Sequence, residues 1–352
     1  MYSEDDLNSA VAAGALSREA AQGLRDHVAH LRGMPRGSEE NFRLLNSFND
    51  IFVTIAAVLL LVAVGSIGNA VYLPLAAVAV GALSWALSEY FALKRRMALP
   101  SIVLAIAFIG SCALLLPLIG AELVSGDNRD WFLIPAGPIA AIAAFAHWRR
   151  FRVPITIAAG TAALVGMAVA SLLSVIEVVL GPLAATSVPP VVLVCGICVF
   201  AFAMYWDAQD PARLTRRSDV AFWLHLLAAP MIIHPLFSFY GVFSATGMDT
   251  IGAAAIIATY VVMGLVALAI DRRALLVSAL AYVLYALGQL VEAFGAIEGG
   301  VSITTLVIGS ALLMLSTFWA KLRASLLPLL PAELREKLPP LHAEPLPAPV
   351  AA

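Results

Sequence analysis

Two histidines and two prolines in one apolar stretch are the strongest candidates for chemistry in this chain. His225 and His234 lie nine residues apart, in a segment that also contains Pro230 and Pro235. Each proline removes a backbone donor and frees the carbonyl four residues before it. A broken helix with free carbonyls and two imidazoles could line a cavity or bind a cation or a small solute. The other interpretation is that each neutral imidazole bonds a neighbouring helix and the prolines only kink.

A carboxylate and a cysteine pair are the next candidates. Glu89 precedes the basic run Lys94–Arg96 by about one turn. It is a candidate for handling protons or substrate, or simply for pairing with those cations. Cys195 and Cys198 share one face of a helix, so their thiols could meet or hold a soft metal ion. Cysteine is also a good small apolar packer, and two thiols without a nearby histidine are a poor ligand set. No metal site and no cofactor are predicted.

Gln289 and Glu292 are weaker candidates near the end of a later apolar stretch. They belong to a series of mostly acidic residues on one side of the expected bundle. That side could concentrate cations before they enter. The same pattern is also what remains when basic residues are confined to the opposite side.

The composition indicates what surrounds these residues. Of 352 residues, 61% are hydrophobic and 12% are charged, about half the ~25% usual for a soluble domain. The mean hydropathy is +0.92 and the net charge is −2. These values exclude a soluble enzyme, a disordered chain and a nucleic-acid binder, so the chain is predicted to be a polytopic membrane protein in contact with the lipid bilayer. No catalytic motif is visible, and we do not expect an enzyme.

Ten apolar runs are long enough to cross a bilayer core, which needs about 20 residues per helix. Helices are expected because the runs lack the alternating polarity of a membrane barrel. The ten predicted spans are Phe48–Gly68, Ala70–Leu93, Leu99–Gly120, Trp131–Trp148, Pro154–Ile176, Val188–Trp206, Ser218–Tyr240, Thr250–Ile270, Ala274–Phe294 and Val301–Ala320.

The basic residues predict how these spans are oriented. They cluster before the first span and after each even-numbered span, and 20 of the 21 fall on one side of the ten-span arrangement. The exception is Arg129. Because cytoplasmic loops carry the excess of Lys and Arg, both termini are predicted in the cytoplasm. The expected fold is an all-α integral membrane protein of ten transmembrane helices in the cytoplasmic (inner) membrane.

The ends of the chain are predicted to form separate parts. Residues 1–47 should form a cytoplasmic helical hairpin, with Gly14 ending the first helix and Ser17 capping the second. Residues 48–320 form the ten-span domain. Residues 321–352 form a proline-rich tail in which one short amphipathic helix fits over Ala332–Leu338. The hairpin holds too little core to be stable alone, so it is a candidate site for a protein partner.

The hairpin carries a resemblance to a known group. The turn Gly14-x-Leu16-Ser17-x-Glu19, followed by several hydrophobic spans, resembles bacterial predicted multi-span membrane proteins of unknown function. That group has a cytoplasmic helical hairpin with a Gly-x-Leu-Ser-x-Glu turn. The resemblance covers about a tenth of the chain and implies a bacterial cytoplasmic membrane. It assigns no binding or catalytic residue.

Two functions from different classes stay open at the level of the sequence. The ten spans, the expected break in the seventh span and a division into five-plus-five inverted halves favour a small-solute secondary transporter or permease. The low charge within the spans and the cytoplasmic hairpin favour a non-catalytic membrane scaffold or assembly partner. A membrane-embedded enzyme is a third and weaker hypothesis.

Overall fold

Every element that the structure describes is a helix. The computed structural model describes residues 4–31, 48–124, 131–181, 186–211, 213, 215–241, 250–273, 275–276, 280, 283–285, 287 and 300–341, and these ranges contain no strand. The membrane domain consists of α3 (Phe48–Val71), α4 (Leu73–Ser88) with the π-helix η1 (Glu89–Lys94), α5 (Ala98–Leu123), α6 (Ala136–Phe151), α7 (Ile155–Leu180), α8 (Val188–Asp207), α9 (Arg216–Phe239), α10 (Thr250–Ile270) and α12 (Gly300–Leu326).

Eight helices of the described chain are long and apolar enough to cross a membrane. This confirms a multi-pass helical protein but falls short of the predicted ten spans. The fourth predicted span becomes α6, whose 16 residues reach only about 24 Å at 1.5 Å per residue. It begins at Ala136 instead of Trp131, because Pro135 and Pro138 favour a helix start there. The ninth predicted span lies largely outside the described residues.

Two further boundaries differ from the prediction for clear physical reasons. Helix α3, the first predicted span, continues beyond Gly68 to Val71. The chain then turns at Tyr72, which has an extended backbone, and Pro74 lies in the first turn of α4. Gly68 makes this tight hairpin feasible, because a Cβ there would come within 2.8 Å of the Ala76 backbone. The expected break in α9 is absent: the helix runs from Arg216 to Phe239 through both Pro230 and Pro235.

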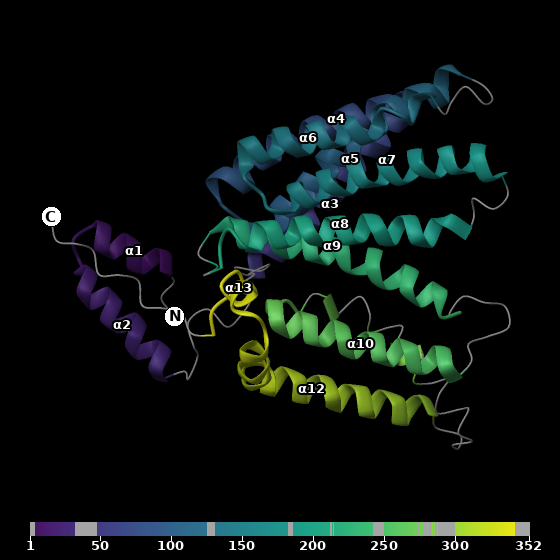
Figure 1. The fold of residues 1–352 in the computed structure, drawn as a ribbon. Coiled ribbons are helices and arrows are strands. Elements are labelled where there is room, and N and C mark those ends of the chain that lie inside the picture. The colour runs from purple at the N-terminus through teal and green to yellow at the C-terminus, as the bar shows by residue number, and fades with distance from the viewer. Residues whose placement is uncertain are drawn as a thin grey trace.

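The helices pack mainly against their neighbours in sequence (Figure 1). Extensive contacts join α3 to α4, α4 to α5, α6 to α7 and α8 to α9. One buried apolar cluster joins α9, α10 and α12, and a second joins α7, α8 and α9. Much of the remaining apolar surface is exposed, as on α3, where Phe52 and Leu59 are 61% and 65% exposed. Such faces suit lipid contact.

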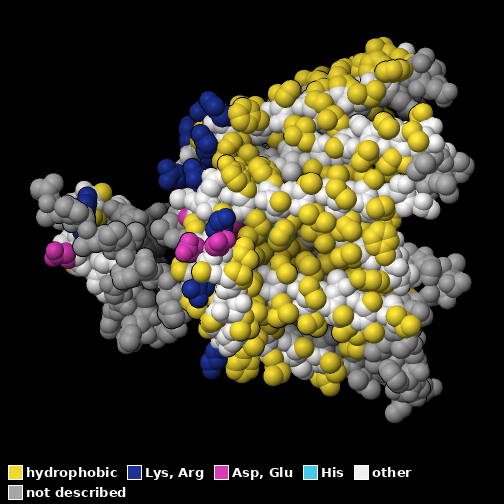
Figure 2. Space-filling model, in the orientation of Figure 1, with side chains coloured by type: hydrophobic (Ala, Val, Ile, Leu, Met, Phe, Trp, Pro, Cys, Tyr) yellow, Lys and Arg dark blue, Asp and Glu magenta, His cyan; other side chains and the backbone are white. Residues whose placement is uncertain are grey.

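The basic turns of the domain gather at one end of the bundle, which we call the basic end (Figures 1 and 2). It is formed by the turns after η1, α6, α8 and α10 and by the end of α12. Each of these four turns contains one non-glycine residue in the left-handed backbone conformation: Arg96, Arg152, Arg213 and Asp271, with φ between 51° and 56°. The repeat of this backbone feature after every second helix shows that the helical hairpins end in similar turns.

The amino-terminal hairpin consists of α1 (Glu4–Ala12) and α2 (Arg18–Leu31), and it stands off the basic end (Figure 1). Gly14 adopts φ +72° after α1, and the Ser17 hydroxyl accepts a hydrogen bond from the Ala20 amide at 3.1 Å. The predicted stop and cap of the hairpin are therefore confirmed.

The carboxyl-terminal segment folds back against the basic end. After η4 (Leu327–Leu329) and α13 (Ala332–Arg335), Leu338 is buried in the same apolar cluster as α10 and α12. Arg323 donates to the carbonyls of Pro339 and Pro340. The predicted helix Ala332–Leu338 is thus shorter than expected, and the chain up to residue 341 is packed.

Candidate functional site

A buried ion pair joins the ends of two helices at the basic end. Asp207 is the last residue of α8, and Arg272 follows α10. Arg272 Nε donates to Asp207 Oδ2 at 3.1 Å, and a terminal nitrogen of Arg272 donates to Oδ1. The two side chains are only 2% and 4% exposed. A two-pronged guanidinium–carboxylate contact has the geometry that makes such a pair strong and specific.

Two residues of α9 complete this group. His225 Nε2 donates to Asp207 Oδ2 at 2.9 Å, since an ionised carboxylate can only accept. Arg272 also donates to the backbone carbonyl and the hydroxyl of Ser218, each at 3.1 Å. We call Asp207, Ser218, His225 and Arg272 the Asp207 cluster. It connects α8, α9 and the turn after α10 through side chains buried from solvent.

The second imidazole nitrogen of His225, Nδ1, takes no part in the hydrogen bonds of the cluster. It is buried and has no hydrogen-bond partner among the described residues. The ring is fully buried and lies against Phe200, with the ring centroids 5.3 Å apart. A buried polar atom without a partner is costly, so the cluster is not fully satisfied in this conformation.

A second group of hydrogen-bonded side chains lies beside the Asp207 cluster and joins the same two chain segments, the end of α8 and the turn after α10. Arg213, after α8, donates to Asp271 Oδ2 at 3.0 Å and to the carbonyls of Ile270 and Asp271 at 3.0 and 2.7 Å. Trp319 of α12 donates from Nε1 to Asp271 Oδ1 at 2.7 Å. We call Arg213, Asp271 and Trp319 the Asp271 group. The acid that ends α8 pairs with a base after α10, and the acid after α10 pairs with a base after α8.

This crossed arrangement constrains the local backbone. Arg213 and Asp271 both adopt φ near +55°, which is unfavourable for residues that carry a Cβ. Their side-chain and backbone hydrogen bonds offset that cost. The loop between α8 and α9 is also held by hydrogen bonds, because Asp210 Oδ2 accepts from the amide and the hydroxyl of Thr215 at 2.8 and 2.7 Å. Thr215 is the N-cap of α9, so the loop geometry sets where α9 begins.

A weaker pair links the first half of the basic end. Arg150 of α6 donates to both carboxylate oxygens of Glu89 at 2.8 and 2.7 Å. Their side chains are 53% and 37% exposed. Glu89 therefore pairs across to α6 and not with the nearby Lys94–Arg96 run. Arg216 donates to the carbonyl of Arg152 at 3.1 Å, which joins the second basic turn to the third.

The structure separates the two histidines that the sequence suggested as one site. His225 is fully buried in the Asp207 cluster, whereas His234 is exposed on α9. Cys195 is half-buried, Cys198 is exposed, and neither forms a disulfide. Within the part of the chain that the structure describes, no group of three metal-ligating side chains occurs. Gln289 and Glu292 lie outside the described residues.

The prolines of α9 do not open a cavity toward α8. Gly196 of α8 packs against Met231, and a Cβ at Gly196 would come within 2.9 Å of the Met231 backbone. Pro235 is buried and Pro230 is exposed. The α8–α9 interface is therefore closely packed beside the prolines in this conformation.

One more buried histidine was not singled out from the sequence. His147 of α6 is fully buried among Trp85, Phe108 and Phe151, and its Nε2 lies 3.5 Å from the Ser88 hydroxyl. No charged side chain contacts it in the described structure. It packs α4 and α6 together, in contrast to His225, which contacts a carboxylate.

Most of the Asp207 cluster also escaped sequence reasoning. Arg272, like Arg213 of the neighbouring Asp271 group, served there only to predict orientation, and Asp207 was not considered. The available signal was the placement of acidic residues: Asp207, Asp210 and Asp271 stand at span ends on the side where basic residues gather. Acids there are positioned to pair with the basic residues of adjacent turns.

Comparisons with protein-family models, with curated proteins and with solved structures give no match. The geometry of the basic end is accordingly the basis for interpreting function.

Proposed function

We propose that this multi-pass membrane protein is a small-solute secondary transporter or permease whose inner gate is the Asp207 cluster. The observation that carries the proposal is the burial of a carboxylate, a guanidinium and an imidazole between α8, α9 and the turn after α10. Ionisable residues buried in helical membrane proteins are expensive and commonly mark a route for ions or substrate.

The side chains of the Asp207 cluster support this proposal, because a buried ion pair can be either formed, which closes the gate, or broken, which opens it. Buried ion pairs add little net stability, but breaking one leaves an uncompensated charge. A solute that binds Arg272 in place of Asp207 would compete with the ion pair and break it. The helix ends that it joins would then be free to separate. The partnerless nitrogen of His225 gives the cluster an unused donor or acceptor for that second arrangement.

Helix α9 connects this gate to the middle of the bundle. It carries His225 at the gate and, further along, Pro230 and Pro235 on either side of Met231, which packs against Gly196 of α8. A helix with prolines in its interior lacks hydrogen bonds at those turns and bends more readily there. In the proposed cycle, opening of the Asp207 cluster lets α9 bend at these prolines and separate from α8. The close α8–α9 packing then represents the state closed at the basic end.

The remaining sequence expectations form part of the same proposal. The basic end is assigned to the cytoplasm of a bacterial inner membrane, with both termini on that side and ten spans in total. The eight long apolar helices are compatible with this, with α6 and the segment 274–294 as the other two. The similar left-handed turns after η1, α6, α8 and α10 favour a repeat of helical hairpins over five-plus-five inverted halves.

The experiment that tests transport uses purified protein in liposomes that contain a trapped pH indicator. Amino acids, sugars, nucleosides and organic acids are added one class at a time, with and without a pH gradient. We expect at least one class to move protons faster than in protein-free vesicles. D207N should abolish that signal, whereas E333Q, which changes an exposed tail carboxylate, should retain it. Absence of flux for the entire panel, with or without a gradient, would remove the support for transport.

A second candidate function is a non-catalytic scaffold, and the amino-terminal hairpin favours it. Helices α1 and α2 form a short two-helix unit that stands off the basic end, and Leu24 of α2 is 43% exposed. A partner protein would cover this apolar surface. Purification of the intact chain should then yield a partner in fixed stoichiometry that is lost when residues 1–47 are removed. An unchanged set of co-purifying proteins after the deletion would contradict the scaffold.

A further inference from the structure

The two halves of the basic end differ in their balance of charge. The segments 89–96 and 149–152, at η1 and the end of α6, contain six basic residues and one acidic residue. The segments 207–219 and 271–273, which follow α8 and α10, contain five basic and four acidic residues. On the face that Figure 2 shows, basic side chains gather alone around the end of α6, whereas basic and acidic side chains lie together around the end of α8. Confinement of basic residues to one side of a membrane applies to both halves alike, so it does not explain this difference.

The acidic residue of the first half is already neutralised. Glu89 accepts two hydrogen bonds from Arg150, and this pair joins η1 to the end of α6. Asp50, at the start of α3, does not offset the nearby cations, because its side chain is buried and has an interaction of its own. The other five basic side chains of the two segments are exposed and contact no carboxylate in the described structure. We call them the η1–α6 cation patch: Lys94, Arg95, Arg96, Arg149 and Arg152.

Two arginines of the patch lie against aromatic rings one turn earlier in the chain. The Arg149 guanidinium is 5.8 Å from the centre of the Phe145 ring, and the Arg152 guanidinium is 5.4 Å from the centre of the Trp148 ring. A ring that covers one face of a guanidinium leaves the N–H groups at its edge available. Within the described structure, neither guanidinium donates a hydrogen bond. Both are therefore positioned to receive an anion.

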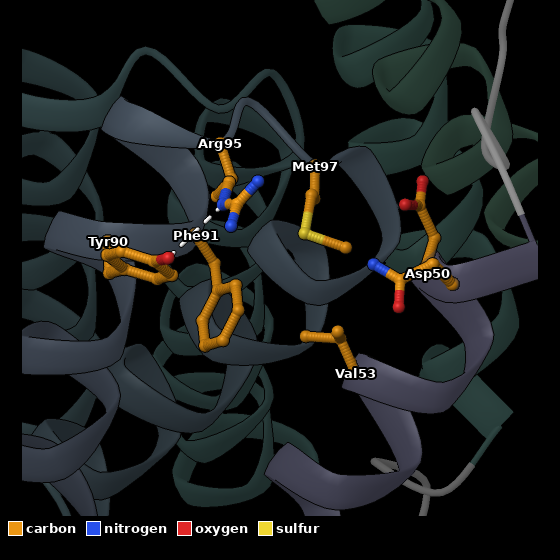
Figure 3. Close-up of a pocket in the computed structure, with 7 residues that line it drawn as sticks. Asp50, Val53, Tyr90, Phe91, Arg95 and Met97 are labelled. Atoms are coloured by element: carbon orange, nitrogen blue, oxygen red, sulfur yellow. Dashed lines mark hydrogen bonds between the residues drawn. The ribbon is translucent and has the colours of Figure 1, made fainter.

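The same arrangement recurs in η1. The Arg95 guanidinium lies 5.7 Å from the centre of the Tyr90 ring, and its Nε donates to the Tyr90 hydroxyl at 3.2 Å (Figure 3). The ring and the cation are five residues apart here and four apart in α6, because η1 is a π-helix and its hydrogen bonds span five residues. An arginine held at one nitrogen keeps its terminal nitrogens for the oxygens of a phosphate.

The aromatic rings place these guanidinium groups beside lipid. Phe145 is 57% exposed, and Ile142, on the same face of α6 and further from the basic end, is 69% exposed. An acyl chain that lies along these two side chains brings its phosphate to Arg149. Clusters of about four to eight basic residues at the end of membrane helices attract anionic headgroups. The patch therefore combines the charge that a headgroup needs with the apolar surface that its chains need.

We propose that the η1–α6 cation patch binds an anionic phospholipid, whose phosphate accepts hydrogen bonds from the ring-stacked arginines. A zwitterionic lipid binds less tightly, because Glu89 is held by Arg150 and the patch offers no carboxylate to an ammonium group. The bound lipid joins η1 to α6 beside the exposed Glu89–Arg150 pair. This site is independent of the proposed transport, because it shares no residue with the Asp207 cluster.

The test is native mass spectrometry of the full chain in detergent, with added phosphatidylglycerol, which is anionic, or phosphatidylethanolamine, which is zwitterionic. We expect tighter retention of phosphatidylglycerol. R149Q combined with R152Q should lower that affinity about 30-fold, which is about 2 kcal/mol at 1.4 kcal/mol per tenfold. R217Q combined with R273Q is the matched control, because it removes two exposed arginines from the second half of the basic end. This control should leave the affinity nearly unchanged.

A further variant should change the affinity in the opposite direction. E89Q releases Arg150 from its carboxylate and adds a sixth cation to the patch. We expect the affinity for phosphatidylglycerol to rise about fivefold, as for one added basic residue near a charged headgroup. Misfolding cannot produce tighter binding, so this comparison decides the outcome even if R149Q with R152Q fails to fold. An unchanged or lower affinity in E89Q would contradict the proposal.

Competition distinguishes the lipid from other anions. Inorganic phosphate should not displace phosphatidylglycerol, because it lacks the chains that contact Ile142 and Phe145. Displacement by inorganic phosphate would indicate a soluble anion as the occupant and would overturn the lipid site. Equal retention of the two lipids by the unmodified chain would also overturn it. So would equal phosphatidylglycerol affinity in the two double variants, and a co-purifying acidic protein lost only from R149Q with R152Q would then be the occupant.

Discussion

The two halves of the basic end use the same pairing chemistry in opposite environments. Glu89 and Arg150 form a two-pronged ion pair with side chains 37% and 53% exposed, whereas Asp207 and Arg272 form theirs at 4% and 2%. Exposed pairs are screened by water and salt and contribute little. Buried pairs lose their hydration, so a single missing partner is expensive. The difference indicates that the Glu89–Arg150 pair only positions α6. The Asp207–Arg272 pair instead controls whether α8, α9 and the turn after α10 stay together.

The largest expected effect comes from removing the buried cation. Arg272→Met leaves the Asp207 carboxylate buried with only His225 as a polar partner. We expect it to lower the free energy of unfolding by about 3–5 kcal/mol. The measurement is reversible chemical unfolding in detergent micelles. Arg273→Met is the matched control, because Arg273 is exposed and contacts the Trp319 ring instead of a buried carboxylate.

The corresponding double variant sharpens this result. Asp207→Leu with Arg272→Met removes both charges, so it should recover most of the lost stability. If the double variant is as unstable as the sum of the two single variants, the two side chains are not coupled. Burial of Asp207 and Arg272 would then not make either side chain depend on the other.

An intermediate effect is expected in the Asp271 group. Asn tolerates the left-handed backbone at position 271, so Asp271→Asn mainly removes the charge that faces Arg213. We expect a loss of about 1–3 kcal/mol in unfolding free energy, because Arg213 keeps its two backbone carbonyl partners. The change in tryptophan fluorescence relative to the unmodified chain, which has six tryptophans, reports the same change, because Trp319 donates to Asp271. Unchanged stability together with unchanged fluorescence would show that this group does not support the cluster beside it.

A smaller effect is expected where α8 and α9 pack beside the prolines. Gly196→Ala places a methyl group within 2.9 Å of the Met231 backbone, so the helices must separate slightly, at about 1–2 kcal/mol. Gly166→Ala is the matched control, because nothing lies within 4 Å of a Cβ there. That control should be neutral or slightly stabilising, since alanine favours a helix more than glycine does. Equal thermal unfolding of the two variants would mean that the α8–α9 contact is looser than described.

The smallest effect is expected for the exposed pair. Glu89→Gln should change the unfolding free energy little, and the remaining difference should shrink further at high salt. Thermal unfolding at low and high ionic strength measures this directly. A large, salt-independent loss of stability would place Glu89 in a buried network and would erase the contrast between the two halves.

The sequence predicted the class of the fold well and the site only in part. Long apolar runs reveal membrane helices directly, and Gly14 and Ser17 correctly predicted how the amino-terminal hairpin turns. Local patterns could not show that Asp207 meets Arg272, because 65 residues separate them and only the packing of α8 and α10 against α9 brings them together. The prediction of a break in α9 failed because helix packing compensates for hydrogen bonds lost at proline.

The proposed transport cycle requires the Asp207 cluster to open, and cysteine accessibility at Ser218 measures that opening. Ser218 is 7% exposed and accepts hydrogen bonds from Arg272. S218C is placed in a chain whose three native cysteines are replaced by alanine. The labelling rate with a membrane-impermeant maleimide is then measured in liposomes. We expect slow labelling at rest and faster labelling from the basic end when a pH gradient and a transported solute are present. Labelling that stays slow while solute flux proceeds would contradict the gate.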